Sequence, residues 1–243
     1  MYSLFVKEIR TFLSSLLGYI IIVVFLLAIS LFMWIIQGES NVLDAGYANI
    51  NTLFAIGPMV FLFLIPAITM RSFAEERRSG TIELLLTRPL TDLQIILAKY
   101  FAGIILVGIS ILPTLVYYYT VWRLGVPMGN IDSGGTWGSY LGLMFLGASF
   151  VSIGVFASSL TDSQILSFVI AFVLCFVCYL GFEALSSLSV FGKADTLIQT
   201  LGINEHYNSI SRGVIDTRDV VYFGSFNAFF ILLTRTVLES RKW

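Results

Sequence analysis

Charged residues are scarce in this sequence. Asp, Glu, Lys and Arg together make up 12% of its 243 residues, it has one histidine, and its formal net charge is −1. A net charge this small gives no sign of a nucleic-acid partner, and we expect none. By contrast, 57% of the residues are hydrophobic and the mean hydropathy is +0.89. This composition is typical of a membrane protein that crosses the bilayer several times.

Cysteines and cofactor-binding motifs are also scarce. Cys175 and Cys178 form a C-x-x-C inside an apolar run, where low dielectric disfavours the thiolates that redox and metal chemistry need. We interpret them as packing residues. The sequence has no G-x-x-x-x-G-K-[ST] phosphate-binding loop, because its one Gly-Lys pair, Gly192-Lys193, lacks the required flanking residues. We therefore expect no metal, cofactor or catalytic site on this chain.

Long stretches without charge indicate the fold. About 20 apolar residues cross the roughly 30 Å of hydrocarbon as a helix, and runs of this length are too long for barrel strands. The predicted fold class is an all-α integral membrane protein, one domain over residues 1–243. The predicted spans cover residues 16–36, 52–70, 95–121, 137–160, 164–185 and 219–236.

The distribution of Lys and Arg predicts the orientation. If six helices cross the membrane, ten of the 14 lie on the side of the two termini and four on the other side. Positive residues favour the cytoplasm, so both termini and the segment from Arg71 to Lys99 are predicted to be cytoplasmic. The first apolar run is not a cleaved leader, because it is too long and no A-x-A site follows it.

The segments between the spans carry weaker signals. Residues Tyr2–Ser14 predict an amphipathic interfacial helix, or alternatively the plain start of the first span. Thr91-x-x-Gln94 and Thr161-x-x-Gln164 both predict capping boxes. The glycine-rich segment Gly125–Gly138 predicts an external loop with little structure. Short external helices are expected within residues 185–219.

Few polar groups lie inside the predicted spans. The charge-free stretches of the first four spans offer no ionisable group to couple transport to protons or sodium. This disfavours an ion-coupled carrier and an intramembrane protease. Asn227, in the sixth span, is expected to form a hydrogen bond between helices. If the protein transports a solute, its energy must therefore come from a partner.

The most polar segment runs from Arg71 to Gln94, between two apolar runs. It contains charges of both signs beside an apolar turn, which suits contact with another protein at the membrane surface. We predict that its contact residues are Phe73, Glu75, Glu76, Arg77, Gly80, Thr81, Glu83, Leu84 and Leu85.

The motifs of this segment resemble a known family. Phe73-Ala-Glu75-Glu76-Arg77-Arg78-Ser-Gly80-Thr81-Ile-Glu83-Leu84-Leu85, with Pro89-Leu90 and Leu97-Ala98-Lys99 after it, is similar to the signature of type 2 ABC-transporter permeases. Lys7-Glu8, Ser158-Ser-Leu-Thr161 and Arg212-Gly-Val-Ile-Asp216 extend the resemblance over nearly the whole chain. Within the family, Asn41-Val-Leu-Asp44 and Pro66-Ala-Ile-Thr-Met70 resemble the gliding-motility-associated permease of Bacteroidetes.

The resemblance implies a permease subunit of an ATP-driven exporter in the bacterial inner membrane. Two such chains, identical or different, would pair and dock on an ATPase dimer that binds ATP and Mg²⁺. The loop between spans two and three would form the coupling helix, and the external segment before span six would form short re-entrant helices. Span one is favoured for the contact with the second permease, with exposure to lipid as the alternative.

A second hypothesis stays open on the residues alone. A membrane anchor that holds an ATPase-driven machine without transporting a solute would need the same docking loop. The identity of any substrate cannot be derived from the sequence.

Overall fold

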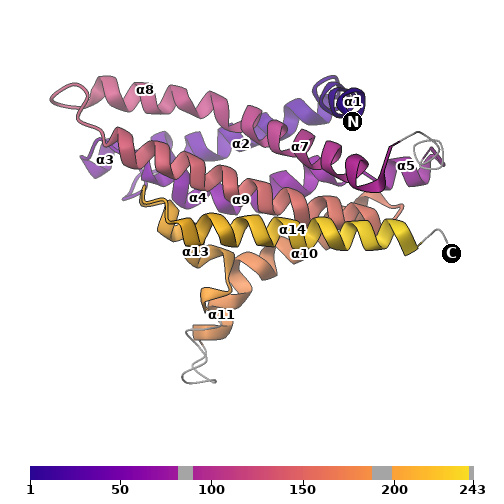
Figure 1. Ribbon diagram of the computed structural model, residues 1–243. Coiled ribbons are helices and arrows are strands. Elements are labelled where there is room, and N and C mark those ends of the chain that lie inside the picture. The colour runs from indigo at the N-terminus through magenta and orange to yellow at the C-terminus, as the bar shows by residue number, and fades with distance from the viewer. Residues whose placement is uncertain (82–89, 188–198, 241–243) are drawn as a thin grey trace.

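The computed structural model describes residues 1–81, 90–187 and 199–240 of this chain, and within them every regular element is helical (Figure 1). The helices within residues 1–81 are α1 (Tyr2–Leu13), α2 (Leu16–Ser30, extended by a π-helical turn Leu31–Ile35), α3 (Val42–Ala45), α4 (Asn51–Thr69) and α5 (Ala74–Arg78). The helices named in the later part of the chain are α7 (Asp92–Ile111), α8 (Leu115–Leu124), α9 (Ser133–Leu160), α10 (Gln164–Phe176, extended by Val177–Gly181), α11 (Phe182–Ser187), α13 (Ile203–Ile210) and α14 (Thr217–Glu239).

Six helical segments of the described chain are long and apolar enough to cross a membrane, which confirms the predicted fold class. They are Leu16–Ile35, Asn51–Arg78, Asp92–Leu124, Ser133–Leu160, Gln164–Ser187 and Thr217–Glu239. The second segment is longer than expected, because α5 follows α4 after a short turn. The third begins three residues before the expected residue 95 and ends three after the expected residue 121.

The central element is α9, which packs against α4, α7, α10 and α14 (Figure 1). Small residues allow this close approach. A Cβ on Gly147 would lie 2.8 Å from Val107 Cγ1, and one on Gly154 would collide with the Thr69 hydroxyl. Packing of this kind associates membrane helices, since lipid supplies no hydrophobic force between them.

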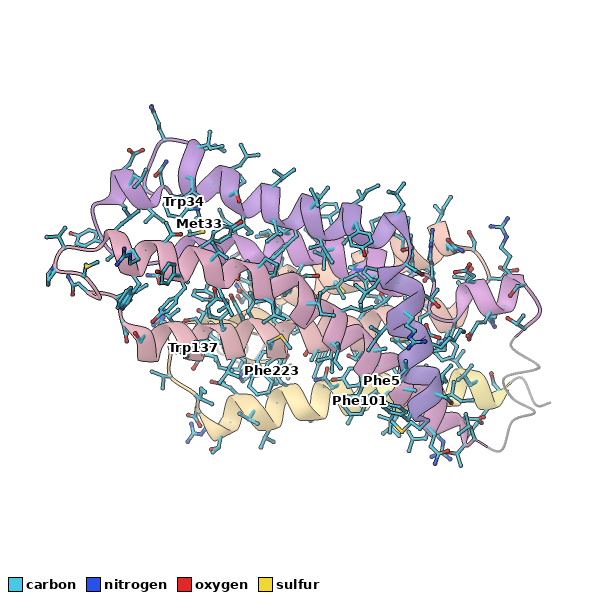
Figure 2. All side chains as sticks on the ribbon, turned by 90° about the horizontal axis from the view of Figure 1, so that it is seen from above. Phe5, Met33, Trp34, Phe101, Trp137 and Phe223 are labelled. Atoms are coloured by element: carbon cyan, nitrogen blue, oxygen red, sulfur yellow. The ribbon has the colours of Figure 1, made fainter. Side chains whose placement is uncertain are left out.

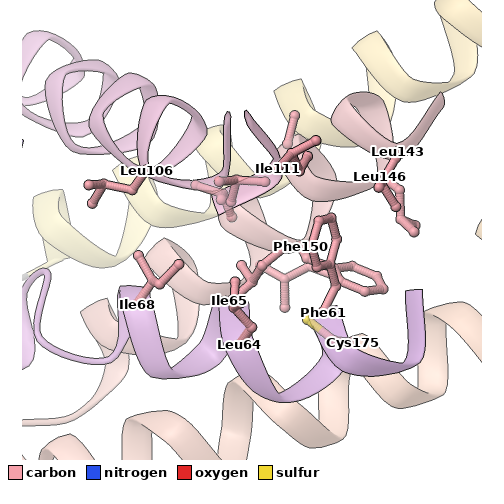
Figure 3. Close-up of a cluster of buried hydrophobic side chains, with 14 of the residues drawn as sticks. Phe61, Leu64, Ile65, Ile68, Leu106, Ile111, Leu143, Leu146, Phe150 and Cys175 are labelled. Atoms are coloured by element: carbon pink, nitrogen blue, oxygen red, sulfur yellow. The ribbon is translucent and has the colours of Figure 1, made fainter. Parts of the chain in front are cut away.

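Apolar side chains from several helices fill the space around α9. Phe61 of α4, Leu106 of α7 and Phe150 of α9 are buried in one cluster (Figure 3). Cys175 of α10 is fully buried in the same cluster, and Cys178 is also a free thiol. The structure therefore uses Cys175 for packing.

The two predicted capping boxes have different outcomes. Thr91 and Gln94 form the reciprocal pair at the start of α7, as predicted. The prediction at Thr161 was wrong, because Ser163 is the N-cap of α10 and accepts from Leu166 N. Thr161 instead is the C-cap residue of α9. Only Asp162 and Ser163 separate it from Gln164, so the turn between α9 and α10 is very short, and Ser163 caps α10.

The glycine-rich segment was partly mispredicted. The loop after α8 ends at Asp132, whose carboxylate accepts a hydrogen bond from Gly135 N and so starts α9 at Ser133. An N-cap hydrogen bond outweighs the low helix propensity of nearby glycines. Gly134, Gly135 and Gly138 are therefore helical rather than part of a loop.

The N-terminal helix is separate from the first span. The helix α1 ends before Ser15, which is the N-cap residue of α2. The Ser15 hydroxyl accepts a hydrogen bond from Gly18 N. α1 lies across the spans and packs on α7 (Figure 2). The helix α1 is thus separate from span one, and its place in a membrane interface stays a prediction.

The two ends of the bundle differ in what they contain. α1, α5 and the last turns of α14 lie at one end, whereas α3 and the turn between α8 and α9 lie at the other (Figure 1). The short helix α13 belongs to the end without α1, and it confirms the expectation of short helices before the sixth span for residues 203–210.

One face of helix α13 is buried against the helices of the bundle. Its Ile203, Tyr207 and Ile210 are buried, and the Tyr207 hydroxyl donates to the Phe54 carbonyl of α4 at 2.6 Å. That carbonyl lacks the usual i+4 donor in its own helix, because the residue four positions later is Pro58, which has no N–H. Tyr207 thus satisfies a group that the proline leaves open.

The turn after α13 packs directly on α9. A Cβ on Gly138 would lie 2.7 Å from the Gly213 Cα, and one on Gly142 would lie 2.8 Å from Ile210 Cγ2. The Ser139 hydroxyl donates to the Ser211 carbonyl at 2.7 Å. Backbone contact and short hydrogen bonds therefore fix α13 to the core.

Candidate functional site

The predicted contact segment begins where α4 ends. A turn follows Thr69, and α5 (Ala74–Arg78) continues toward the end of the bundle that holds α1 (Figure 1). The hydroxyl of Ser158, from α9, accepts hydrogen bonds from Phe73 N at 2.8 Å and Ala74 N at 3.1 Å. It also donates to Met70 O at 3.2 Å. Ser158 thus satisfies the open N–H groups at the start of α5 and ties α5 to the central helix.

Four charged residues join α5 to two other helices, and we call them the ion network. Lys99 of α7 contacts Glu76 of α5 at 2.9 Å and Glu8 of α1 at 3.0 Å. Lys7 of α1 contacts Glu76 at 2.9 Å and Glu8 at 3.4 Å. Two ammonium groups therefore balance two carboxylates across three helices that are far apart in the sequence.

Lys99 is the buried centre of the ion network. Its side chain is 1% exposed, and its ammonium also donates to the Ser72 carbonyl at 2.6 Å. The same group lies 4.9 Å from the ring centroid of Phe73, close enough for a cation–π interaction. A buried ammonium is costly unless paired and hydrogen-bonded, so these partners explain how Lys99 occupies an otherwise apolar helix.

Lys7 is the outer cation of the ion network. Burial by itself lowers the pKa of Lys7, but the Glu76 hydrogen bond and the charges of Glu8 and Glu76 outweigh it and raise the pKa above its ordinary value. Lys7 is consequently charged at neutral pH, and the attraction is lost only when the pH rises above that raised pKa.

The structure separates the predicted contact residues into inward and outward groups. Phe73 and Glu76 are buried against neighbouring helices, whereas Glu75, Gly80 and Thr81 are exposed. Arg77 is half-buried and lies near enough to Asp162, in the turn between α9 and α10, for electrostatic attraction. The remaining predicted residues, Glu83, Leu84 and Leu85, lie outside the described residues.

A tight turn follows α5. Gly80 has a φ of +69°, a conformation that glycine adopts without strain. The hydroxyls of Ser79 and Thr81 are 2.9 Å apart, and Thr81 donates to the Glu76 carbonyl at 3.3 Å. This turn presents the exposed residues at the end of the bundle.

Sequence reasoning missed the partners that hold α5. Lys7, Glu8, Lys99 and Ser158 belong to the motifs that carry the family resemblance, but the sequence does not mark them as one site. A signal existed for Lys99, because a charged residue next to a long apolar run needs a partner. Nothing in the spacing could indicate that the partners would come from α1 and α5.

The arrangement suits mechanical coupling. Across residues 1–81, 90–187 and 199–240, no group of three His, Cys, Asp or Glu side chains is placed to hold a metal ion. What the site offers is a short exposed helix whose inner face is tied to α1, α7 and α9. The helix α5 is therefore in direct contact with three other helices.

Comparison with known proteins identifies one family. The sequence profile of the ABC-2 family transporter proteins matches residues 2–237. No curated protein matches the chain.

Proposed function

Because the chain belongs to the ABC-2 family of transporter proteins, whose members are membrane transport subunits of ABC transporters rather than catalysts, we propose that it is an ATP-driven permease subunit. It would function as an exporter whose energy comes from a separate ATPase, bound through residues 71–90. ATP and Mg²⁺ would be held by that ATPase.

One observation carries this proposal. Within the described residues the outer side of α5 is exposed, while its inner side is tied by the ion network and Ser158 to α1, α7 and α9. An ATPase that moves α5 would therefore move the helices that cross the membrane. Glu75, Gly80 and Thr81 are the described residues best placed for the contact, because they are exposed.

A second permease chain completes the proposed transporter. One α5 engages one ATPase subunit, so an ATPase dimer requires two permeases. Residues of α2 such as Tyr19, Val23 and Leu27 are more than half exposed, which both a contact with the second permease and exposure to lipid require. The positive-inside count supports placing α1, α5 and both termini at the cytoplasmic face of the bacterial inner membrane.

The biological role that we propose, a part in gliding motility, rests on short sequence motifs. Among them, Asn41 caps α3 with its side chain and is buried, and Asp44 lies in the same helix. Deleting the gene in the parent bacterium should abolish gliding if this role is right, and unchanged movement would contradict it.

Co-purification tests the core of the proposal. The permease should retain an ABC ATPase expressed with it, in a complex of two permease chains and two ATPase subunits. Recovery of the permease without any ATPase would contradict coupling. A complex that hydrolyses ATP but moves no solute in a reconstituted vesicle would favour the anchor.

A further inference from the structure

A cavity of about 260 Å³ lies beside the ion network. It is bounded by the junction of α1 and α2, by the end of α4 with α5, and by α7. Ile68, Leu106 and Val155 contribute to its apolar wall, and Thr11, Ser72 and Ser79 contribute hydroxyls. The cavity therefore combines a polar rim with an apolar wall.

Two of the charged side chains that line this cavity lie outside the ion network. Lys7, Glu8, Glu76 and Lys99 balance one another, which leaves Arg71 and Glu75. These two do not pair with each other, and neither forms an ion pair within the part of the chain that the structure describes. The Nε of Arg71 is buried and has no hydrogen-bond partner among the described residues.

An Arg that is partly hidden from water calls for an anionic ligand. The guanidinium matches the geometry of phosphate oxygens, and Glu75, one helical turn further on, offers a carboxylate to a donor cation. A ligand that satisfies both groups carries a phosphate next to an ammonium group.

The position of the cavity indicates where this ligand comes from. Ala67 to Thr69, the last residues of α4, line it, and so does Arg71, two residues after Thr69. This is the level at which the apolar span gives way to charge, and the amphipathic α1 forms another wall, as expected at a headgroup layer. The apolar wall at Ile68 and Leu106 suits the beginning of an acyl chain.

We propose that this cavity binds the headgroup of a phosphatidylethanolamine molecule. The phosphate contacts Arg71, and the primary ammonium donates to Glu75. Phosphatidylcholine fits less well, because its quaternary ammonium has no N–H to donate. Phosphatidylglycerol lacks a cation, and would leave Glu75 without a partner.

Native mass spectrometry of the purified full-length permease tests this inference. Phosphatidylethanolamine, phosphatidylcholine and phosphatidylglycerol with the same acyl chains are added in equal amounts. We expect phosphatidylethanolamine to be retained about tenfold over the other two. Equal retention of the three lipids would overturn the proposal.

Substitutions at Arg71 and Glu75 test the phosphate contact and the ammonium contact separately. Arg71→Gln should reduce retention of phosphatidylethanolamine about tenfold, whereas Glu75→Gln should remove its advantage over phosphatidylcholine. Arg78→Gln is the matched control, since Arg78 is exposed and does not line the cavity. If Arg71→Gln and Arg78→Gln bound the lipid equally, Arg71 would not be the ligand.

Two further measurements test the source of the ligand and the fold of the variants. Soluble glycerophosphoethanolamine should compete weakly, and full competition would show a site for the headgroup alone, contrary to a lipid site. Thermal unfolding without lipid verifies that Arg71→Gln is folded, and Arg71→Lys should recover part of the binding. Because lipid retention is measured without the ATPase, loss of ATPase binding and loss of lipid selectivity are distinguishable failures.

Discussion

The two ends of the bundle hold their short helices by different forces. At one end, charged side chains and the Ser158 hydroxyl bind α5 to α1, α7 and α9. At the other, the contacts of α13 with α4 and α9 are backbone packing at Gly138 and Gly213 and neutral hydrogen bonds from Tyr207 and Ser139, and a single contact of 2.7 Å joins its His206 to Asp219 of α14. Both helices are tied to the same central helix, α9.

These forces change differently with distance. The attraction between opposite charges declines as the inverse of their separation, so the ion network keeps part of its strength when α5 shifts. Close packing and short hydrogen bonds weaken steeply over about an ångström. The attachment of α5 therefore combines a long-range attraction with the short Ser158 hydrogen bonds, whereas the contacts of α13 with α4 and α9 are all short-range.

Removing the centre of the ion network should have the largest effect on stability. Lys99→Met leaves Glu8 and Glu76 without their buried cation, and breaking a buried pair in this way costs about 3–5 kcal/mol. Thermal unfolding of the purified protein in detergent measures this loss of stability. Adding Glu8→Gln and Glu76→Gln to the same chain should recover most of the loss. A triple variant as unstable as Lys99→Met would show that shape, not charge, is what Lys99 contributes.

The next largest loss of stability is expected when the close packing at the α13 end is disturbed. A Cβ on Gly213 would collide with Gly135 Cα, and Gly213 has a φ of +85°. Overpacking costs typically 1–3 kcal/mol and a left-handed non-glycine residue about 1–2 kcal/mol, so Gly213→Ala should cost about 2–5 kcal/mol in thermal unfolding.

Gly80→Ala is the matched control at the α5 end. Gly80 has a φ of +69°, and no described heavy atom beyond its chain neighbours lies within 4 Å of the position that an alanine Cβ would occupy. It should therefore show the backbone cost alone, about 1–2 kcal/mol. Equal losses at Gly80 and Gly213 would mean that α13 is not closely packed, and the contrast between the two ends would disappear.

Removing a single hydroxyl at the α13 end should lower the free energy of unfolding by a smaller amount. Tyr207→Phe leaves the Phe54 carbonyl buried and without a donor, which costs about 1–3 kcal/mol. Tyr222→Phe is the control, because its bond to the Leu201 carbonyl, 2.7 Å long, is exposed. Thermal unfolding of both variants compares them, and a larger loss for Tyr222→Phe would contradict the role given to Pro58.

The sequence was informative wherever a pattern is local. Apolar length predicted six spans, and the Thr91 capping box was correct because both of its partners lie within one turn. The same reasoning failed at Thr161, where a neighbouring Ser163 forms the competing cap. It also failed at Gly135 and Gly138, whose small size serves contact with the distant Gly213 rather than a flexible loop.

Contacts between distant segments were beyond what the sequence could predict. Ser158 and Lys99 lie 85 and 26 residues from Phe73, and nothing local marks them as its neighbours. Asn227 was expected to hydrogen-bond to another helix, yet its Oδ1 is buried and has no hydrogen-bond partner in the described part of the chain. The structure does not explain why a polar residue stands at position 227.

The last prediction separates stability from coupling within α5. Glu75 is exposed and outside the ion network, so Glu75→Lys should change the free energy of unfolding by no more than about 0.5 kcal/mol. Glu76→Lys, by contrast, places a third cation beside Lys7 and Lys99 and should destabilise the protein. If Glu75 contacts the ATPase rather than a lipid headgroup, Glu75→Lys should release the ATPase from a fully folded permease, as measured by co-purification. Undiminished ATPase recovery with Glu75→Lys would place the contact elsewhere on the turn, whereas loss of the folded permease would show that Glu75, like Glu76, supports the fold.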